Sequence, residues 1–269
     1  MHWPRFCQSC SLLVLSSLAF VAVGVSQQPL DPAPGTPPRV GPPLSEASAA
    51  DLEARGDALR TQKLNLDALD YYRAALRKAP AQPGLFNKIG ITELQLLRYR
   101  DAKKDFERAI KLDRDYADAY NNLGVVMYLQ RKHKQAISQY RKALGINEQA
   151  ASFHSNLAAA YFARKEFDKA VWEYGRALAL DPEVLDRTSR SGVAAQLASP
   201  EDRAQYDYVL AKLYARSGDL ERALRHLRRA IEEGYGPIAN VYKDSEFSVL
   251  RSDSGFQELM ADKPLALPN

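Results

Sequence analysis

The chain has 269 residues, of which 37 are lysine or arginine and 33 are aspartate or glutamate, so its formal net charge is only +4. This small excess does not supply the concentrated basic surface that nucleic-acid binding requires, and we expect no nucleic-acid partner. The two cysteines, Cys7 and Cys10, lie near the N-terminus. The rest of the chain therefore offers no disulfide and no thiolate metal site, and a helical core alone must stabilise it.

The first 26 residues have the layout of a secretory signal. Arg5 supplies positive charge, the apolar and small residues of Ser11–Val25 follow, and small residues predict cleavage after Ser26. This pattern predicts an exported protein, periplasmic or secreted. The alternative is an uncleaved N-terminal segment that anchors the chain in the inner membrane, although the run is shorter than the roughly 20 residues of a membrane span. Both cysteines precede the run, so a lipoprotein anchor is not expected.

Residues 27–46 are rich in proline. Such a segment cannot be helical and favours extended polyproline geometry, so we expect a disordered, semi-rigid tether. A ligand for an SH3-type domain is the other interpretation of such a segment, and it suits an exported chain poorly. The prolines are Pro29, Pro32, Pro34, Pro37, Pro38, Pro42 and Pro43.

After the tether, the same residue types recur at intervals of 34 positions without a gap. A small residue comes first, and an alanine, an aromatic residue and a second alanine follow in each unit. The small residues are Gly56, Gly90, Gly124 and Ala158. The later positions are Ala68, Ala102, Ala136 and Ala170, then Tyr72, Phe106, Tyr140 and Tyr174, then Ala75, Ala109, Ala143 and Ala177. A period of this length predicts a solenoid of small helical units.

Each unit has the pattern of two amphipathic helices. In the third unit, large apolar residues such as Leu123 and Met127 recur at helical spacing around Gly124, and Tyr140 and Leu144 do so around Ala136. The small residues mark places where two helix backbones approach closely. Because one helix pair cannot bury its own apolar stripes, it must stack on its neighbours.

The units resemble tetratricopeptide repeats. The fourth unit carries the family pattern nearly whole, and the resemblance extends without interruption over residues 49–182. The matching residues of that unit are Leu157, Ala158, Tyr161, Ala170, Tyr174, Ala177 and Pro182. The resemblance implies an all-α fold: a right-handed solenoid of antiparallel helix pairs, about five repeats long, with a C-terminal helical cap. We place four in-phase units at 47–182.

A fifth unit follows out of phase, at 204–234, after an insertion at 183–203. Ser199 is a suitable N-cap and Pro200 suits the first helical position, so the first helix of this unit is predicted to begin early, near Pro200. The apolar stretch Ser191–Leu197 is expected to pack over the seam between the fourth and fifth units. Residues 235–269 are predicted to form the cap, with two short helices at Glu246–Leu250 and Gly255–Met260; a separate peptide-binding tail is the alternative.

Catalytic and metal-binding motifs are missing from the sequence. Outside the signal segment the histidines are His133, His154 and His226, in three different units, and this scatter does not predict a metal cluster. His154 occupies a core position that is usually aromatic, where a hydrogen-bonded ring would fill space. Phosphate-binding loops and hydrolase motifs are also lacking. We therefore expect no enzyme activity, no cofactor and no metal.

Tetratricopeptide repeats bind ligands along the concave side, which the first helix of each unit lines. The resemblance places thirteen residues on this side as partner contacts: Asn87, Ile91, Leu94, Gln95, Asn121, Val125, Tyr128, Leu129, Ser155, Phe162, Tyr208, Lys212 and Arg216. Among them, Tyr128 and Phe162 are expected to be exposed. Asn87 and Asn121 occupy equivalent positions, and their amides suit either an extended peptide or hydrogen bonds between helices.

These features predict a non-enzymatic scaffold that binds an extended peptide or a protein in envelope assembly or secretion. A first alternative is an envelope-surface structural protein whose basic fifth repeat contacts anionic lipid. A second is an accessory subunit of an enzyme encoded elsewhere. Membrane contact is expected only through the N-terminal segment or that basic patch, and the oligomeric state stays open. The basic residues are Arg222, Arg225, Arg228 and Arg229.

Overall fold

A computed structural model describes residues 39–185, 199–236 and 238–261, and these ranges contain helices and connecting turns without strands. The predicted signal segment, the first part of the tether and the apolar stretch Ser191–Leu197 lie outside them. Within them, no helix has the length and apolar character needed to cross a membrane.

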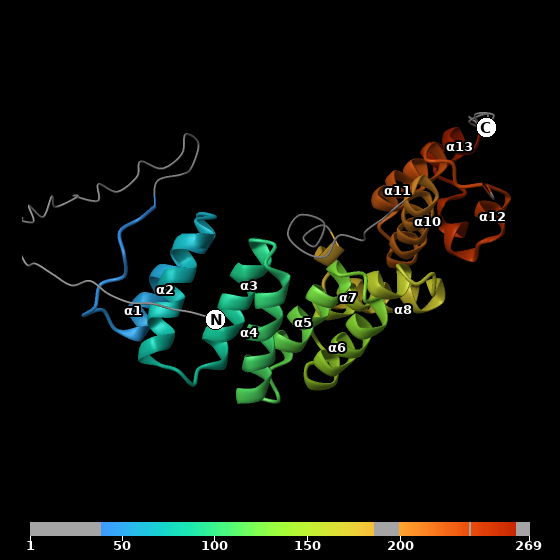
Figure 1. Cartoon of the computed structure of the whole chain (residues 1–269). Helices are drawn as coiled ribbons and strands as arrows, with labels where there is room; N and C mark the ends of the chain where they lie inside the picture. The colour runs from blue at the N-terminus through green and yellow to red at the C-terminus, as the bar shows by residue number, and fades with distance from the viewer. Residues whose placement is uncertain (1–38, 186–198, 237, 262–269) are drawn as a thin grey trace, which may run out of the picture. The chain divides into compact units, whose positions relative to one another are not determined.

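Four helix pairs form the repeat region, and the helices of each pair lie antiparallel (Figure 1). The first helices begin at residues 49, 83, 117 and 151, so the period of the sequence is also the period of the structure. The solenoid fold predicted from that period is confirmed. The pairs are α1 (Ala49–Thr61) with α2 (Asn65–Lys78), α3 (Pro83–Gln95) with α4 (Tyr99–Leu112), α5 (Ala117–Leu129) with α6 (His133–Ile146), and α7 (Ala151–Phe162) with α8 (Phe167–Leu180).

Every first helix ends in the same turn. A residue one to three positions after the helix has a positive φ, between 60° and 62° in the first four units and 83° at Gly218 in the fifth. The amide that follows this residue bonds to the carbonyl five residues back, as Lys132 does to Met127 at 2.9 Å. This is a Schellman motif, which usually has glycine at the left-handed position. Here four non-glycine residues occupy that position: Lys63, Leu97, Arg131 and Lys165.

Within a unit, an aromatic ring of the second helix lies against the small residue of the first. A Cβ atom added to Gly124 would stand 2.5 Å from a ring carbon of Tyr140, and the equivalent distance at Gly90 is 2.6 Å. The ring therefore fills the space that the absent side chain leaves. The third-unit ring is fully buried, as is the equivalent Tyr72 of the first unit. This contact explains the pairing of glycine and aromatic residue in the sequence.

Between units, the second helix of one pair packs on the first helix of the next, as α2 does on α3, α4 on α5 and α6 on α7. The first helices also meet directly, α3 with α5 and α5 with α7. They therefore form a continuous surface, which we call the first-helix face.

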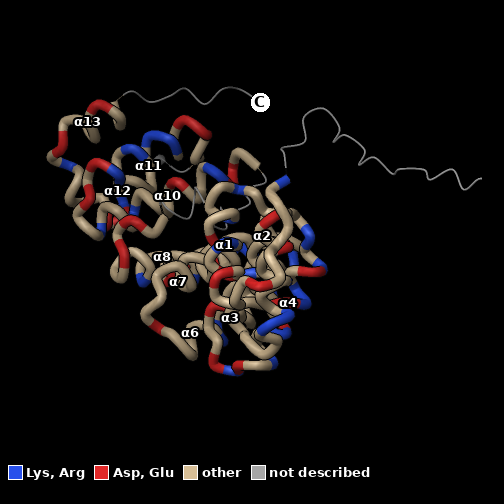
Figure 2. The backbone as a smooth tube through the Cα atoms, turned by 90° about the vertical axis from the view of Figure 1, so that its left-hand side faces the viewer, with Lys and Arg blue, Asp and Glu red and all other residues tan. Residues whose placement is uncertain are grey.

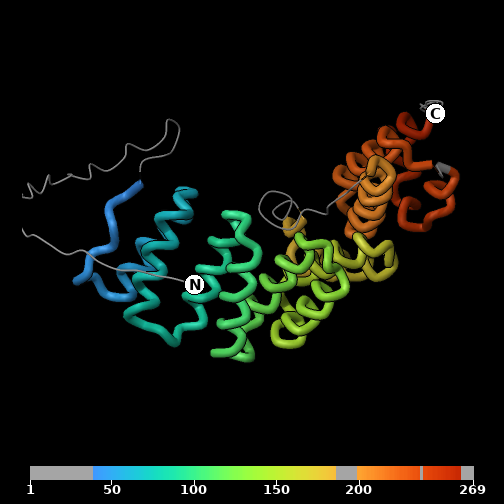
Figure 3. The backbone as a smooth tube through the Cα atoms, in the orientation of Figure 1, coloured from blue at the N-terminus to red at the C-terminus, as the bar shows by residue number. Residues whose placement is uncertain are grey.

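The fifth unit begins as predicted. Helix α10 (Pro200–Ser217) starts at Pro200, and the Ser199 hydroxyl accepts a hydrogen bond from the Asp202 amide as its N-cap. Helix α11 (Leu220–Glu232) follows. Three short elements follow in the described residues, and η1 packs on α10 while α13 packs on α11 (Figure 3). They are α12 (Ile238–Lys243), the 3-10 helix η1 (Ser245–Leu250) and α13 (Ser254–Ala261). The sequence predicted the last two and missed α12.

The last residues of the predicted tether contact the first unit. Val40 packs against the apolar core of that unit. The Tyr71 hydroxyl donates a hydrogen bond to the Gly41 carbonyl at 3.1 Å, and the Lys78 ammonium donates to the Ser45 carbonyl at 2.6 Å. The expectation of a disordered tether is therefore wrong for these last residues, which lie on α2.

Candidate partner-binding face

A ladder of hydrogen bonds joins neighbouring first helices. The Asn122 amide donates to the Asn87 side-chain oxygen at 3.0 Å, and the Asn156 amide donates to Asn121 at 2.9 Å. Lys88 makes the equivalent bond to Glu53 at 2.7 Å, with charged groups in place of amides. The sequence left two roles open for Asn87 and Asn121, contact with a peptide or hydrogen bonds between helices. In the structure both side chains form hydrogen bonds between helices.

The expectation that Tyr128 and Phe162 are exposed is wrong. Tyr128 is 0% exposed and lies edge-on to the His133 ring, with ring centroids 5.2 Å apart. Phe162 is 4% exposed, and it packs edge-on against Phe167 and against Tyr206 of α10. Each ring therefore belongs to the core.

The fourth unit presents little side-chain surface along its first helix. Every residue of α7 from Phe153 to Phe162 is buried, including Ser155. Tyr206, which the sequence did not single out, also lies edge-on to Tyr174. It lies near the start of α10, within the predicted fifth unit at 204–234.

Four aliphatic side chains remain half-buried on the first-helix face, together with one exposed amide, Gln95. Two are on α3 and two on α5, and these helices touch. Their methyl groups pack partly on the core and partly face solvent. We call the set the aliphatic strip: Ile91, Leu94, Val125 and Leu129.

A charged network closes the strip on the side of the first unit. Asp57 accepts hydrogen bonds from Lys88 at 2.6 Å and from the Tyr72 hydroxyl at 2.7 Å. Burial acts to raise the pKa of Asp57, but these two donors outweigh it and hold the pKa below its usual value. Burial and the bond to Asp57 raise the pKa of Tyr72 to about 12. Lys88 was missed by sequence reasoning, although it lies 34 positions before Asn122.

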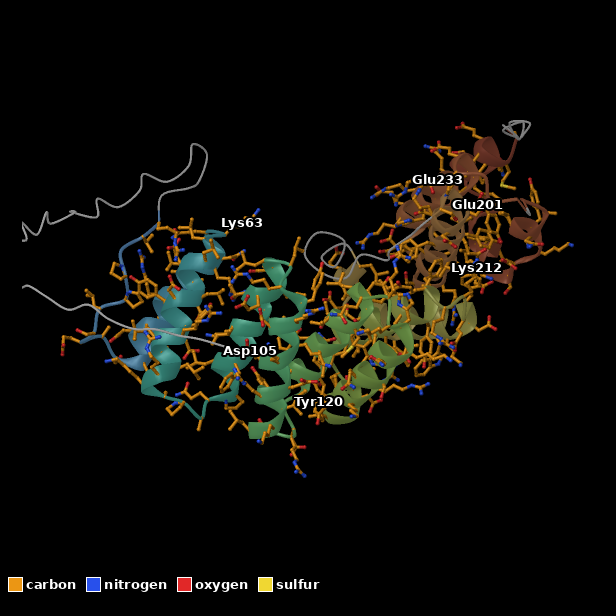
Figure 4. The ribbon with its side chains drawn as sticks, in the orientation of Figure 1. Lys63, Asp105, Tyr120, Glu201, Lys212 and Glu233 are labelled. Carbon is orange, nitrogen blue, oxygen red and sulfur yellow. The ribbon has the colours of Figure 1, made fainter. Side chains whose placement is uncertain are left out.

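At the other end, the C-terminal cap occupies the first-helix face of the fifth unit. Tyr208 is buried, stacks on Tyr235 with ring centroids 3.9 Å apart, and donates a hydrogen bond to Asp244 at 2.6 Å. Lys212, labelled on α10 in Figure 4, forms ion pairs with Asp244 at 3.0 Å and Glu246 at 3.4 Å. Two of the predicted contact residues are therefore bound by the cap, while Arg216 stays exposed.

The buried histidines have hydrogen-bond partners in their own units and, for His154, also in the unit before. His154 Nδ1 lies 2.7 Å from the Glu173 carboxylate, and its Nε2 lies 3.0 Å from the Glu148 carbonyl. His226 Nδ1 lies 2.6 Å from the Asp207 carboxylate. The core role expected for His154 agrees with these contacts. Across the described ranges, histidine, cysteine and carboxylate side chains form no group suited to hold a metal ion.

The basic residues of α11 lie among acidic ones (Figure 2). Arg225 pairs with Glu221 at 2.7 Å, and Arg229 pairs with Asp207 at 3.3 Å. Arg222 pairs with Asp219 at 2.8 Å and also with Glu183. Much of the positive charge of the fifth unit is thus neutralised within the unit and its neighbour.

Comparison with known families agrees with this geometry. A tetratricopeptide-repeat family model matches residues 87–151 and 130–184. Residues 87–184 therefore carry tetratricopeptide repeats. No curated protein matches its sequence.

Several solved structures are similar to the chain. MamA from Desulfovibrio magneticus RS-1 is 18% identical over 72% of this chain and 99% of its own, with a TM-score of 0.49. TTC0263 from Thermus thermophilus is 23% identical over 76% of this chain and 99% of its own, with a TM-score of 0.49. YrrB, described as having an unusual peptide-binding site, is 19% identical over 73% of this chain and 91% of its own, with a TM-score of 0.46.

Proposed function

We propose that this protein is a non-enzymatic scaffold that binds an extended peptide or a protein segment along α3 and α5. The observation that carries the proposal is the aliphatic strip. Its four side chains stay half-buried on two adjoining helices. Apolar surface that a folded chain leaves partly open between polar flanks is typical of a protein-binding surface.

The flanks of the strip define what the partner meets. On one side lies the network of Lys88 with Glu53 and Asp57, in which each charge already has a partner. On the exposed edge, Gln95 offers one amide that can both donate to and accept from a peptide backbone. Because the asparagine amides are engaged between helices, affinity rests on apolar contact with the strip. Backbone recognition is limited to its rim.

We also propose that the protein acts outside the cytoplasm, in envelope assembly or secretion. This part rests on the signal-like residues 1–26 alone. N-terminal sequencing of the protein recovered from the producing cells tests it. A mature N-terminus at residue 27 is expected, and an intact Met1 in the soluble cytosolic fraction would contradict export.

The strip is tested by the double substitution Ile91→Ser with Val125→Ser, two positions separated by one repeat. The matched control is Leu112→Ser with Ile146→Ser, which removes two equally spaced aliphatic side chains that are 46% and 39% exposed on second helices. Crosslinked partners are recovered on each variant and identified by mass spectrometry. We expect the proteins captured by the wild type and the control to be lost from the strip variant. Equal capture by all three would remove the strip as the binding surface.

A further inference from the structure

The seam between the fourth and fifth units differs from the first and third seams. At the first seam Arg73 of α2 reaches Glu93 of the next unit at 2.5 Å, and at the third Arg141 of α6 reaches the Tyr161 hydroxyl at 2.5 Å. These two arginines occupy the same repeat position. At the fourth seam that position is Gly175, which has no side chain to extend across the gap.

A pocket of about 370 Å³ opens at this place, between α8 and α10. A Cβ atom added to Gly175 would meet only Leu213, at 3.6 Å, which is an ordinary contact distance. Ala179 and Val171 of α8 complete the apolar wall. Gly175 thus leaves this pocket without the arginine that crosses the first and third seams.

Trp172 stands at the rim of this pocket and is 59% exposed. The equivalent positions of the earlier units carry the polar residues Asp70, Lys104 and Ser138. The guanidinium of Arg176 lies over the indole, 5.6 Å from the ring centroid, and so orients it. Tryptophan and arginine are both enriched among the residues that dominate binding energy at protein interfaces.

The charge around the pocket has one sign. Its lining, drawn from the residues that the structure describes, contains Arg176 and Arg216 and no carboxylate. Arg176 is paired with Glu148 at 2.9 Å, whereas Arg216 is exposed and forms no ion pair within those residues. A neighbouring pocket shares Trp172 but includes Asp168 and Glu173, so it lacks this one-sided charge.

We propose that this second surface, separate from the aliphatic strip, binds an acidic peptide segment of a partner protein. One apolar side chain of the segment enters the pocket beside Trp172, and a flanking carboxylate pairs with Arg216. The volume is ample for a leucine or phenylalanine side chain. Charge complementarity with the arginine selects an acidic flank over a basic one.

Trp172 itself reports occupancy. Trp3 is the other tryptophan of the chain, so Trp3→Phe leaves Trp172 as the single source of indole emission. The full-length Trp3→Phe protein is titrated with the probe acetyl-DDLFDD-amide, and separately with acetyl-KKLFKK-amide. We expect a saturable change in emission for the acidic probe, with a dissociation constant on the order of 1 mM or tighter. The basic probe should bind at least tenfold more weakly.

Three variants test the location. Gly175→Arg restores the residue of the first and third seams and should abolish the emission change. Gly145→Arg is its matched control on α6, where an added Cβ has nothing within 4 Å, and it should bind like the parent. Arg216→Glu alters only an exposed side chain and should weaken the acidic probe at least tenfold, whether or not Gly175→Arg folds. The strip variant Ile91→Ser with Val125→Ser should leave probe binding unchanged, which separates this proposal from the proposed function.

Several outcomes would overturn the proposal. They are no saturable change with the acidic probe, equal binding of the basic probe, and unaltered binding by Arg216→Glu. Sedimentation without peptide adds one more outcome. If the chain self-associates and Gly175→Arg abolishes that association, the occupant is a second copy of the chain.

Discussion

The side-chain amide of Asn156 donates a hydrogen bond to the side-chain oxygen of Asn121 at 2.9 Å, from one first helix to the one before it. Both side chains are buried, 6% and 7% exposed. The same bond recurs one unit earlier between Asn122 and Asn87. Polar residues that the sequence suggested as ligand contacts therefore join neighbouring helices of the stack. This is why the proposed binding surface consists of the apolar residues beside them.

Asn156→Ala should destabilise the protein by about 1–3 kcal/mol, because the Asn121 oxygen then stays buried without its donor. Urea unfolding measures the change. Gln95→Ala is the control, since this amide is exposed and its loss should cost less than about 0.5 kcal/mol. Equal effects at the two positions would mean that the ladder adds nothing to stability.

Gly124→Ala should destabilise the third unit, since the new Cβ atom would lie 2.5 Å from the buried Tyr140 ring. Displacing a packed ring costs about 1–3 kcal/mol, which exceeds the gain of up to about 1 kcal/mol that alanine brings to a helix. Gly145→Ala has free space around it and should show the helix gain alone. Thermal unfolding distinguishes them, and a stabilised Gly124→Ala protein would refute the close contact.

Leu97→Gly should stabilise the protein by up to about 1 kcal/mol. The left-handed conformation costs a residue with a side chain about 1–2 kcal/mol, and glycine avoids this cost. Against this gain, glycine loses more chain entropy on folding, which destabilises the protein by about 0.5–1 kcal/mol. Little packing is lost, because Leu97 is 70% exposed. The reverse change, Gly218→Ala, should lower stability at the equivalent turn, where φ is 83°. Paired melting curves test both signs, and a lower melting temperature for Leu97→Gly would count against the strained turn.

His154→Ala should cost about 3–5 kcal/mol, because the Glu173 carboxylate would remain buried without its partner. His226→Ala provides the internal comparison. There Asp207 keeps Arg229 at 3.3 Å, so the loss should be smaller. Urea unfolding measures the loss of stability in both variants. A larger loss for His226→Ala than for His154→Ala would contradict the assigned pairing of each histidine with its carboxylate.

The period of the sequence predicted the fold because helix starts and glycine–aromatic contacts are local to each unit. The period also relates the hydrogen bonds between first helices. Lys88 lies one repeat before Asn122, so each makes the same bond to the first helix of the preceding unit. The burial of Phe162 was not accessible in this way, since Tyr206 reaches it from beyond an insertion. Likewise, nothing in the side chain of Leu97 indicates a positive φ.

The contacts of the C-terminal cap with α10 could not be predicted from the repeat pattern either. The resemblance to tetratricopeptide repeats places Tyr208 and Lys212 at ligand-contact positions. The packing of η1 on α10 instead brings Asp244 and Glu246 against that face. The candidate surface accordingly narrows from five units to the second and third.

Site-specific photocrosslinking at the strip tests the central claim most directly. A photoreactive residue replaces Gln95, on the exposed edge of the aliphatic strip, and in a matched protein it replaces Leu112 on the second helix of the same unit. The account predicts a specific crosslinked partner from position 95 and none from position 112. Crosslinking of the same partner from position 112 alone would place binding on the opposite helices and contradict it.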